Sequence, residues 1–295
     1  MRAEAHVCKK CGHRLHPLAR FVPGQVLNQR YRIQRTLAHG GMGKLYLATD
    51  DNLFDRPVIV KMICNYSDSG DPRNRRQARA MFQDEACTLA SLDYPAFPRI
   101  YDYFEDDSDA YIILEYIVGK DLEDQLTHND AYGHFMPGAP YAQAKVLQWA
   151  IDLCRALEYL ALVQPYPVVH HDIKPANLLI DQHGLIRLVD FGTAHPSGVG
   201  YEPMVRNGQT GHYGTRGYAP CEQYRGETEP RSDIFALGAT LYHLVTDDDP
   251  RMHPGSFPKL KQLGAFGDLL QAMLDPEVTR RPCAGHVRAY LETLV

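Results

Sequence analysis

The front of the chain alternates short apolar and polar segments, and an extended conformation suits that pattern. Strands are expected at 31–37, 44–48, 58–63, 100–103 and 111–117. A helix is expected between the third and fourth strand, where Phe82, Ala86 and Leu89 recur at helical spacing.

Beyond residue 119 the apolar pattern becomes helical. Helices are expected at 141–162, 232–245 and 266–274, and two short apolar runs lie at 178–180 and 186–189. Residues 193–230 are rich in Gly, Pro and polar side chains and predict a long loop, which in a compact domain is often functional.

These elements predict an α+β fold with two lobes. A β-rich lobe is expected at 31–117 and an α-helical lobe at 120–293, with residues 1–30 as an appendage. A cleft between two such lobes is a natural ligand site.

Charge is unevenly distributed along the 295 residues. The net charge is −5, while residues 1–35 carry eight Lys or Arg against one Glu, so the remainder carries −5 − 7 = −12. An acidic body argues against nucleic acid as the main partner. The basic segment is interpreted as a solvated tail, with docking on an acidic partner as the alternative.

No run of 18 or more apolar residues occurs, and the first residues lack the apolar stretch of a secretory signal. Only Cys8 and Cys11 of the seven cysteines are close in sequence. This usage predicts a reducing compartment without a disulfide framework, and hence a cytoplasmic protein without a membrane span.

Candidate chemistry begins in the strand-rich part. A turn with Gly40, Gly41 and Gly43 lies between two expected strands, and glycines let backbone N–H groups fold over a polyanion. Lys61 ends an apolar strand, where it could hold ATP phosphates with Glu85, 24 residues later, as its acidic partner. The alternatives are an ordinary hairpin and an edge-strand lysine facing solvent.

Two strings in the second half are more specific. HHDIKPAN (170–177) is followed by DFG (190–192), and together they resemble the catalytic loop and the D-F-G motif of protein kinases. The resemblance implies that Asp172 orients the substrate hydroxyl and accepts its proton. It implies that Lys174 neutralises charge on the transferred group. Asn177 and Asp190 would hold Mg²⁺ or Mn²⁺ against the phosphates of ATP.

The resemblance covers about residues 31–293. LEYI (114–117) is similar to the hinge, so the backbone of Glu115 and Ile117 would bind adenine, and GTRGY (214–218) resembles the substrate loop. Thr215 is expected to bridge Asp172 and Lys174. The strings APCE (219–222), SDIFALG (232–238) and RRP (280–282) complete the set, with Asp233 bracing the catalytic loop and Arg281 pairing with Glu222.

The chain is thus identified as a member of the bacterial (Hanks-type) serine/threonine protein kinases. The resemblance implies protein substrates, with the chain itself as one candidate. Lys174 and Thr215 favour serine or threonine over tyrosine.

Three positions depart from the family pattern. Ala38 stands where the first glycine of the loop is usual, which would weaken ATP binding if that site needs a positive φ. His171 replaces the arginine that pairs with a phosphate on the activation loop, so activity is expected not to require that phosphate. A protonated His171 could still pair weakly, which would make control pH-sensitive. Arg216 and Cys221 replace prolines of the substrate loop and leave the peptide preference open.

Cys8 and Cys11 resemble one knuckle of a zinc ribbon, but a second C-x-x-C is absent. His13 and His16 are the nearby candidates for the remaining ligands. The alternative is half a ribbon, or a site completed by another chain.

Two other functions are compatible with such a chain. A nucleotide-binding pseudokinase scaffold is supported by Ala38 and His171, although neither residue performs chemistry. A small-molecule kinase of the same fold is less favoured, because 190–222 resembles the protein-directed members.

Overall fold

The computed structural model describes residues 21–40, 43–63, 72–106, 109–129, 134–197, 204–206, 209–211 and 214–295. The chain forms two compact units, and each is considered by itself. The first consists of Met1–Phe82 with Arg99–Tyr116, and the second of Gln83–Pro98 with Ile117–Val295.

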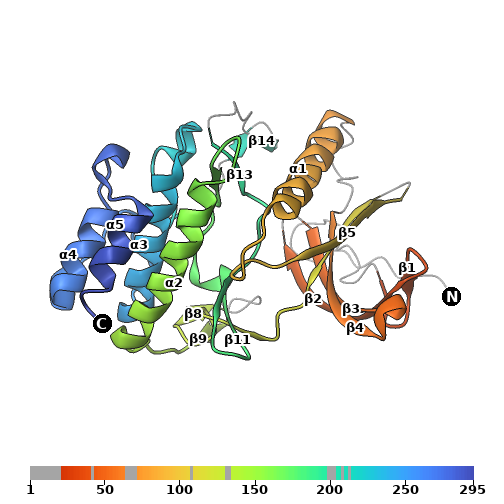
Figure 1. Cartoon of the computed structure of the whole chain (residues 1–295), viewed down its shortest axis with the longest axis horizontal. Helices are drawn as coiled ribbons and strands as arrows, with labels where there is room; N and C mark the ends of the chain where they lie inside the picture. The colour runs from red at the N-terminus through yellow and green to blue at the C-terminus, as the bar shows by residue number, and fades with distance from the viewer. Residues whose placement is uncertain are drawn as a thin grey trace. The chain divides into compact units, whose positions relative to one another are not determined.

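The first unit is built on one antiparallel sheet (Figure 1). Its strands, in spatial order, are β1 (Val26–Leu27), β2 (Tyr31–Gly40), β3 (Gly43–Asp50), β4 (Arg56–Ile63), β6 (Ala110–Glu115) and β5 (Ile100–Glu105).

Strand β4 lies between β3 and β6 and shows how the sheet packs. Val58, Val60 and Met62 are fully buried and share one face, because successive side chains of a strand point to opposite faces. Lys61 therefore lies on the other face, where it is only 8% exposed. A lysine buried in a central strand excludes the alternative of an edge-strand side chain in water.

The sheet also includes residues that precede position 31. Strand β1 pairs with β2, and the ring of Phe21 lies 5.3 Å from that of Tyr46 and 6.3 Å from that of Tyr111. Phe21 and Leu27 belong to the same apolar core as Tyr31.

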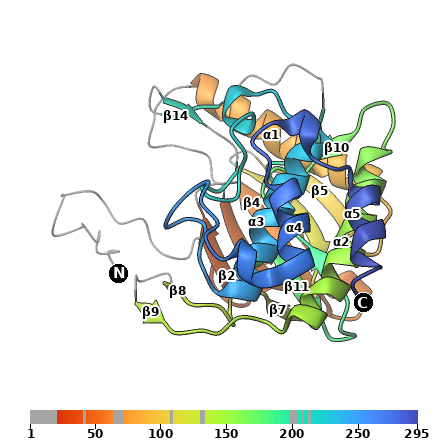
Figure 2. The same cartoon turned by 90° about the vertical axis from the view of Figure 1, so that its left-hand side faces the viewer.

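The second unit is mainly helical (Figures 1 and 2). The helices of the chain are α1 (Pro72–Ser91), which begins in the first unit, α2 (Gln143–Ala161), α3 (Pro230–Thr246), α4 (Gly264–Met273) and α5 (Ala284–Leu291). Single 3₁₀ turns cover Asp51–Leu53, Pro175–Asn177, Gln223–Arg225, Leu260–Leu263 and Val278–Arg280.

Helix α3 is the centre of this unit and contacts both α2 and α4. Every residue from Ser232 to Leu244 is buried, as expected for a helix that is covered on all sides. Its start is fixed by a capping box between Glu229 and Ser232 and by Pro230 at the first helical position. A rigid central helix can therefore position the loops that touch it.

Short strands complete the second unit. Strands β7 (Gly119–Asp121), β11 (Leu178–Asp181) and β12 (Ile186–Leu188) form one sheet. Pairs are formed by β8 (His128–Asn129) with β9 (Phe135–Met136), β10 (Val168–Val169) with β13 (His195–Pro196), and β14 (Met204–Arg206) with β15 (Gln209–Gly211).

The α+β class predicted from the sequence is confirmed, and so are its five longer strands and four longer helices. The prediction of a single loop over 193–230 was wrong in part, because β13, β14, β15 and one 3₁₀ turn lie within it. Helix α5 was not predicted, since its eight residues give only a short periodic signal.

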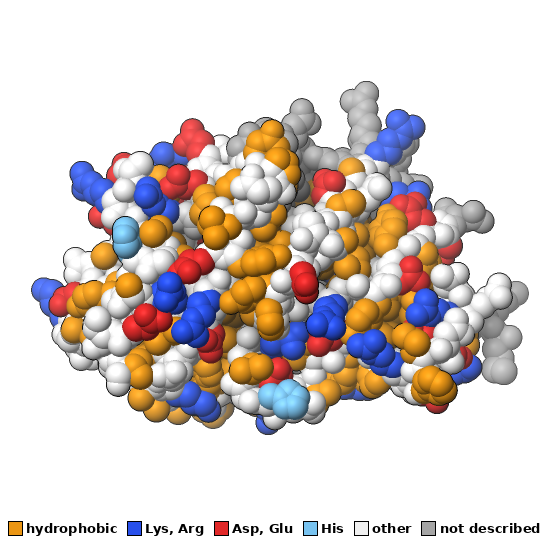
Figure 3. Space-filling model, viewed as in Figure 1, with side chains coloured by type: hydrophobic (Ala, Val, Ile, Leu, Met, Phe, Trp, Pro, Cys, Tyr) orange, Lys and Arg blue, Asp and Glu red, His pale blue; other side chains and the backbone are white. Residues whose placement is uncertain are grey.

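Among the described residues, no helix is long and apolar enough to cross a membrane. On the face drawn in Figure 3, acidic and basic side chains lie interspersed.

Candidate active site

A β-hairpin brings the two expected metal ligands to one place. Strands β11 and β12 are antiparallel, with Leu178 opposite Leu188. Asn177 directly precedes β11 and Asp190 follows β12, so both lie at the same end of the hairpin. The N–H of Val189 donates to the carbonyl of Asn177 (2.9 Å), which continues the pairing to this point.

The carboxylate of Asp172 is the centre of a hydrogen-bonded cluster. Its Oδ2 accepts from Lys174 Nζ (2.7 Å) and from Asn177 Nδ2 (3.1 Å). Its Oδ1 accepts from Thr215 Oγ1 (2.7 Å), and Thr215 Oγ1 in turn accepts from Lys174 Nζ (2.8 Å). The expected bridge by Thr215 is confirmed, although the catalytic roles of these residues remain predictions. The side chain of Asp172 keeps 12% of its surface accessible to solvent.

Helix α3 holds the start of the catalytic loop. The backbone N–H groups of His170 and His171 donate to the two carboxylate oxygens of Asp233 (2.7 and 2.9 Å). Burial raises the pKa of Asp233 to about 7, although both N–H donors favour the ionised form. Thr240, two turns further along α3, donates to the carbonyl of Ile173 (3.1 Å). The expected brace by Asp233 is therefore present.

A buried ion pair holds the end of the activation segment. Arg281 binds Glu222 through two contacts, Nη1 to Oε1 (2.6 Å) and Nη2 to Oε2 (3.1 Å), as expected. Burial is the largest single influence on the pKa of Glu222 and would raise it, but the hydrogen bonds from Arg281, from its own backbone N–H and from Ser232, together with the charge of Arg281, lower the pKa. Because Arg281 is 2% exposed and Glu222 5% exposed, water does not screen this pair.

His171 occupies a different environment from the one its sequence position suggested. It is 1% exposed, its Nδ1 lies 3.0 Å from the carbonyl of Thr193, and its Nε2 lies 2.9 Å from Thr228 Oγ1. Its ring stacks on that of His195, with centroids 4.1 Å apart and planes at 8°.

Burial, together with His195 and His170 nearby, lowers the pKa of His171 well below its usual value. The expectation of a protonated His171 that pairs with a phosphate is therefore wrong. The ring is neutral and both of its nitrogens already have partners.

Phe191 of the DFG string anchors the hairpin end in the apolar interior. It is 1% exposed and packs edge-on against Phe97 (5.1 Å) and His170 (4.8 Å). Burial lowers the pKa of His170 to about 4. Asp190, next in sequence to Phe191, is exposed and adopts φ +63°, a conformation that non-glycine residues rarely take.

In the first unit, strands β2 and β3 flank the glycine-rich turn. Strands β2 and β3 stay paired as far as Gly40 opposite Gly43. A Cβ on Gly43 would lie 2.3 Å from the carbonyl oxygen of Met62, so only glycine fits. Ala38 pairs with Leu45 and is not among the described residues with positive φ. Alanine at this position therefore causes none of the backbone strain that a positive φ would bring.

The other predicted nucleotide-binding residues lie as follows. Lys61 is opposite Leu45 on one side and Ile112 on the other, and is buried. Glu85 is 4% exposed on α1, and their pairing remains a prediction. Glu115 donates its N–H to the carbonyl of Arg99 (2.8 Å), and its contact with adenine remains a prediction. Ile117 follows β6 and is buried.

Three predicted site residues, Gly41, Cys8 and Cys11, lie outside the described residues. Within the described ranges, no group of three or more His, Cys, Asp or Glu side chains could hold a metal ion.

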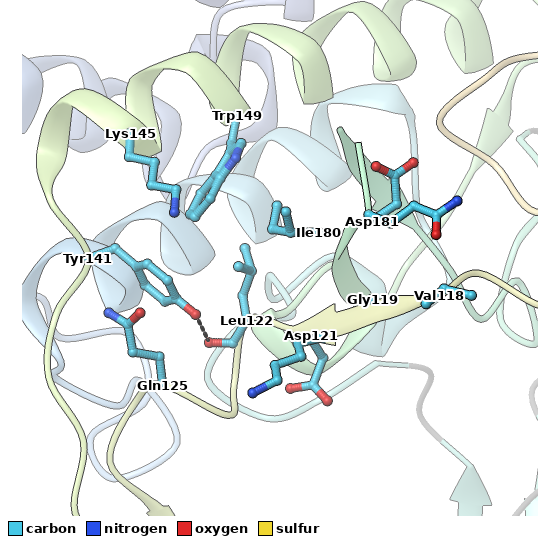
Figure 4. Close-up of a pocket in the computed structure, with 12 residues that line it drawn as sticks. Val118, Gly119, Asp121, Leu122, Gln125, Tyr141, Lys145, Trp149, Ile180 and Asp181 are labelled. Carbon is cyan, nitrogen blue, oxygen red and sulfur yellow. Dashed lines mark hydrogen bonds between the residues drawn. The ribbon is translucent and has the colours of Figure 1, made fainter. Parts of the chain in front are cut away.

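Sequence reasoning missed His195 and a pocket. His195 is brought to His171 by the β10–β13 pairing, in which Val169 lies opposite His195, and that contact has no local sequence signal. The pocket, of about 400 Å³, lies in the helical unit (Figure 4). Trp149 and Lys145 of α2 lie on one side of it and Asp121 on another. No predicted site residue lines it.

An antiparallel sheet, a helical unit and an Asp–Lys–Asn cluster on the loop before a DFG turn, bound by a threonine of the later substrate loop, are the parts of a protein kinase. The protein kinase domain family matches residues 31–289, so the chain belongs to that family.

Curated relatives share this region. The chain is 33% identical to serine/threonine-protein kinase B of Synechocystis over 252 residues, covering 83% of this chain and 40% of the relative. It is 29% identical to serine/threonine-protein kinase PknG of Mycolicibacterium smegmatis over 286 residues, covering 93% of this chain and 33% of the relative. It is 32% identical to tyrosine-protein kinase MasK of Myxococcus xanthus over 261 residues, covering 85% and 37%. The chain thus spans two fifths or less of each of these relatives.

Proposed function

We propose that this chain transfers the γ-phosphoryl group of Mg·ATP to serine or threonine hydroxyls of proteins in bacterial signalling. The observation that carries the proposal is the cluster around Asp172, whose oxygens are bound by Lys174, Thr215 and Asn177. Relatives named as serine/threonine kinases support the reaction class, and Lys174 with Thr215 supports the acceptor class.

The cluster suits a reaction that depends on positioning and charge. Asp172 is held by three side chains and remains partly accessible, so it can orient an acceptor hydroxyl and take its proton. Lys174, shared between Asp172 and Thr215, lies where it can neutralise charge that develops on the transferred group.

The donor set at the hairpin end fits Mg²⁺. Asn177 directs its amide nitrogen toward the carbonyl and carboxylate of Asp172 (2.8 and 3.1 Å), so its oxygen faces away from the aspartate. Asp190 supplies an exposed carboxylate at the same hairpin end. Mg²⁺ uses one or two such hard oxygen ligands and completes its shell with phosphates and water. The ion would neutralise phosphate charge during transfer.

The nucleotide would be held by the sheet unit. The hairpin of β2 and β3 would cover the phosphates, and the hinge backbone would bind adenine. The residues proposed for this role are Ala38, Gly40, Gly41, Gly43, Lys61, Glu85, Glu115 and Ile117.

We further propose that activity does not require a phosphate on the activation loop. The position where the family places arginine is filled by the neutral His171, already bound to Thr193 and Thr228. Thr210→Ala should therefore change kcat by less than about twofold. Loss of activity in Thr210→Ala, restored by Thr210→Glu, would refute this.

The proposed domain limits are 1–30, 31–117 and 120–293, although Phe21 and Leu27 of the first segment already pack in the core of the sheet unit. Cytoplasmic location is supported by Cys87, Cys154, Cys221 and Cys283, which form no disulfide. A zinc ion on Cys8 and Cys11 rests on ligand type alone, and mass spectrometry finding well under about one zinc per two chains would reject it.

The activity is tested by label transfer from γ-labelled ATP with Mg²⁺ to the chain itself, to a basic acceptor protein and to an acidic one. Asp172→Asn is assayed beside Asp268→Asn, a matched change of an exposed acid on α4. Label on serine or threonine that disappears only in Asp172→Asn supports the proposal. Label on tyrosine refutes the acceptor class, and saturable ATP binding without any transfer indicates the scaffold alternative.

A further inference from the structure

The substrate loop is anchored at both ends by glycines that approach backbone closely. A Cβ on Gly214 would lie 2.2 Å from Gln223 Nε2 and 2.7 Å from the carbonyl oxygen of His171. A Cβ on Gly217 would lie 2.5 Å from the carbonyl oxygen of Pro250. Both glycines have positive φ, +88° and +97°, so neither position accepts another residue without strain. The two residues between them are therefore held in fixed places.

Those two residues face different surroundings. Thr215 directs its hydroxyl at Asp172 and Lys174, whereas Arg216 is exposed. In the part of the chain that the structure describes, no carboxylate lies within ion-pair distance of Arg216. Burial raises the pKa of Tyr224; the charge of Arg216 opposes that shift and the charge of Asp172 adds to it, so both charges act on the same phenol.

The exposed charged side chains between Gly214 and Gly226 are basic, and the nearest exposed acid in the following sequence is Glu227. Glu222 is buried and bound to Arg281, so it offers no exposed charge. Arg251, beside Gly217, is already bound by Asp249 and by Glu123, both at 2.8 Å. Within 214–226 the exposed charged side chains are Arg216 and Arg225, both basic.

We propose that Arg216 recognises an acidic group, a carboxylate or a phosphate, within about three positions of the acceptor residue of the substrate. The inference rests on the proposed function and names its substrate class. An acceptor hydroxyl at Asp172 lies next to Thr215, and consecutive Cα atoms such as those of Thr215 and Arg216 are ~3.8 Å apart. An extended peptide advances by ~3.3 Å per residue, so residues flanking the acceptor pass within reach of the guanidinium. Arginine binds carboxylate and phosphate through two parallel hydrogen bonds, which gives orientation as well as attraction.

The effect should fall on KM rather than kcat, because the flanking residue takes no part in the reaction. For an exposed pair we expect acidic peptides to have a kcat/KM about three- to tenfold above a neutral peptide. Arg216→Gln should remove that advantage, and Arg216→Glu should reverse it in favour of peptides with lysine at the same position. Arg280→Gln, which removes another exposed arginine without an ion partner, should leave the preference intact.

The test uses fluorescent peptides with one threonine and one flanking alanine, glutamate, phosphoserine or lysine at each of the three positions on either side. Binding and phosphoryl transfer are both measured with the wild type, Arg216→Gln, Arg216→Glu and Arg280→Gln. An acidic preference that Arg216→Gln abolishes supports the inference, and the glutamate and phosphoserine peptides show which anion is preferred. Equal binding and transfer for all peptides, or a preference unchanged in Arg216→Gln, overturns it. Acid-selective binding without transfer supports the recognition role and contradicts only the proposed activity.

Discussion

His171 and Asp172 are neighbours in one loop, but their side chains lie in opposite environments. The carboxylate of Asp172 is partly exposed and accepts from a lysine, a threonine and an asparagine. The imidazole of His171 is buried, neutral and stacked on a second imidazole. The surroundings of Asp172, called the charged region below, concentrate charge around an accessible oxygen. The surroundings of His171, called the neutral region below, keep charge out of the interior.

The difference separates chemistry from support within one loop. A charged, partly accessible group can act on a substrate, whereas a buried neutral ring with both nitrogens bonded can only hold the backbone in place. Each region can be broken separately, and the expected consequences differ in kind.

The largest effect on the rate of phosphoryl transfer is expected from Asp190, the exposed carboxylate near the charged region. Asp190→Ala removes one of two proposed Mg²⁺ ligands, and metal stabilisation of transferring phosphate contributes several kcal/mol. Transfer should fall by about two to four orders of magnitude, measured as kcat over a Mg²⁺ titration. Asp268→Ala serves as the control, and an Asp190→Ala variant with wild-type activity at low Mg²⁺ would exclude the metal assignment.

The buried ion pair between Arg281 and Glu222 supports the end of the activation segment, and its loss should change stability more than activity. Arg281→Met leaves the buried carboxylate of Glu222 without its cation, which costs about 3–5 kcal/mol of unfolding free energy. Urea unfolding measures this loss. Glu222→Gln combined with Arg281→Met should recover part of it, since no charge is then stranded. A change below about 1 kcal/mol in Arg281→Met would show that the pair does not hold the segment.

Thr215 touches the charged region without carrying charge. Thr215→Ala removes a hydrogen bond to Asp172 and one from Lys174, and hydrogen bonds to charged groups contribute about 1.5–3 kcal/mol. We expect kcat to fall about tenfold to a hundredfold. Thr215→Ser keeps the hydroxyl and should stay within about threefold of wild type. Equal loss in both variants would assign the effect to packing.

The smallest expected effect is the contribution of His171 to the pH dependence of the unfolding free energy. The pKa of His171 is lowered on folding, so its contribution to stability is present above the unfolded pKa of about 6.5 and is lost as pH falls. Its charged form would meet His195 and His170, and its nitrogens already face Thr193 and Thr228. Asp233, with a pKa raised to about 7, acts in the opposite direction and is common to all variants compared.

As the pH falls from about 7 to about 5, the unfolding free energy of His171→Gln should therefore decrease less steeply than that of the wild type. The difference in slope should reach up to about 1.4 kcal/mol per pH unit. Urea titrations at several pH values measure it. Exposed His183→Gln provides the control. An unchanged pH slope in His171→Gln would mean that the ring already binds a proton in the folded protein.

The charged region could be predicted from the sequence because its members are close in sequence or lie in short, distinctive strings. One short loop contains Asp172, Lys174 and Asn177. The β-hairpin of β11 and β12 brings Asp190 close to that loop. These residues were assigned from the resemblance of their strings to protein kinase motifs, and their closeness in sequence agrees with their closeness in the structure. Helix α3, which holds the start of the loop, was predicted from apolar periodicity, whereas β11 and β12 were noted only as short apolar runs.

The neutral region could not be predicted in the same way. His195 meets His171 only through the two-residue strands β10 and β13, which are too short to give a periodic signal. The burial of His171, which changes its protonation, depends on Thr193 and Thr228 from distant parts of the chain. Comparison with the family pattern showed that His171 replaces an arginine, but not that its ring is buried and stacked on His195.

The most direct test measures kcat and unfolding free energy together for Asp172→Asn and His171→Gln. The separation of roles predicts that Asp172→Asn loses about two to four orders of magnitude in kcat and changes stability by less than about 1 kcal/mol. It predicts that His171→Gln loses about 1–3 kcal/mol of stability, while the folded fraction keeps kcat within about threefold. An Asp172→Asn variant that is active, or a His171→Gln variant that is stable but inactive, would contradict it.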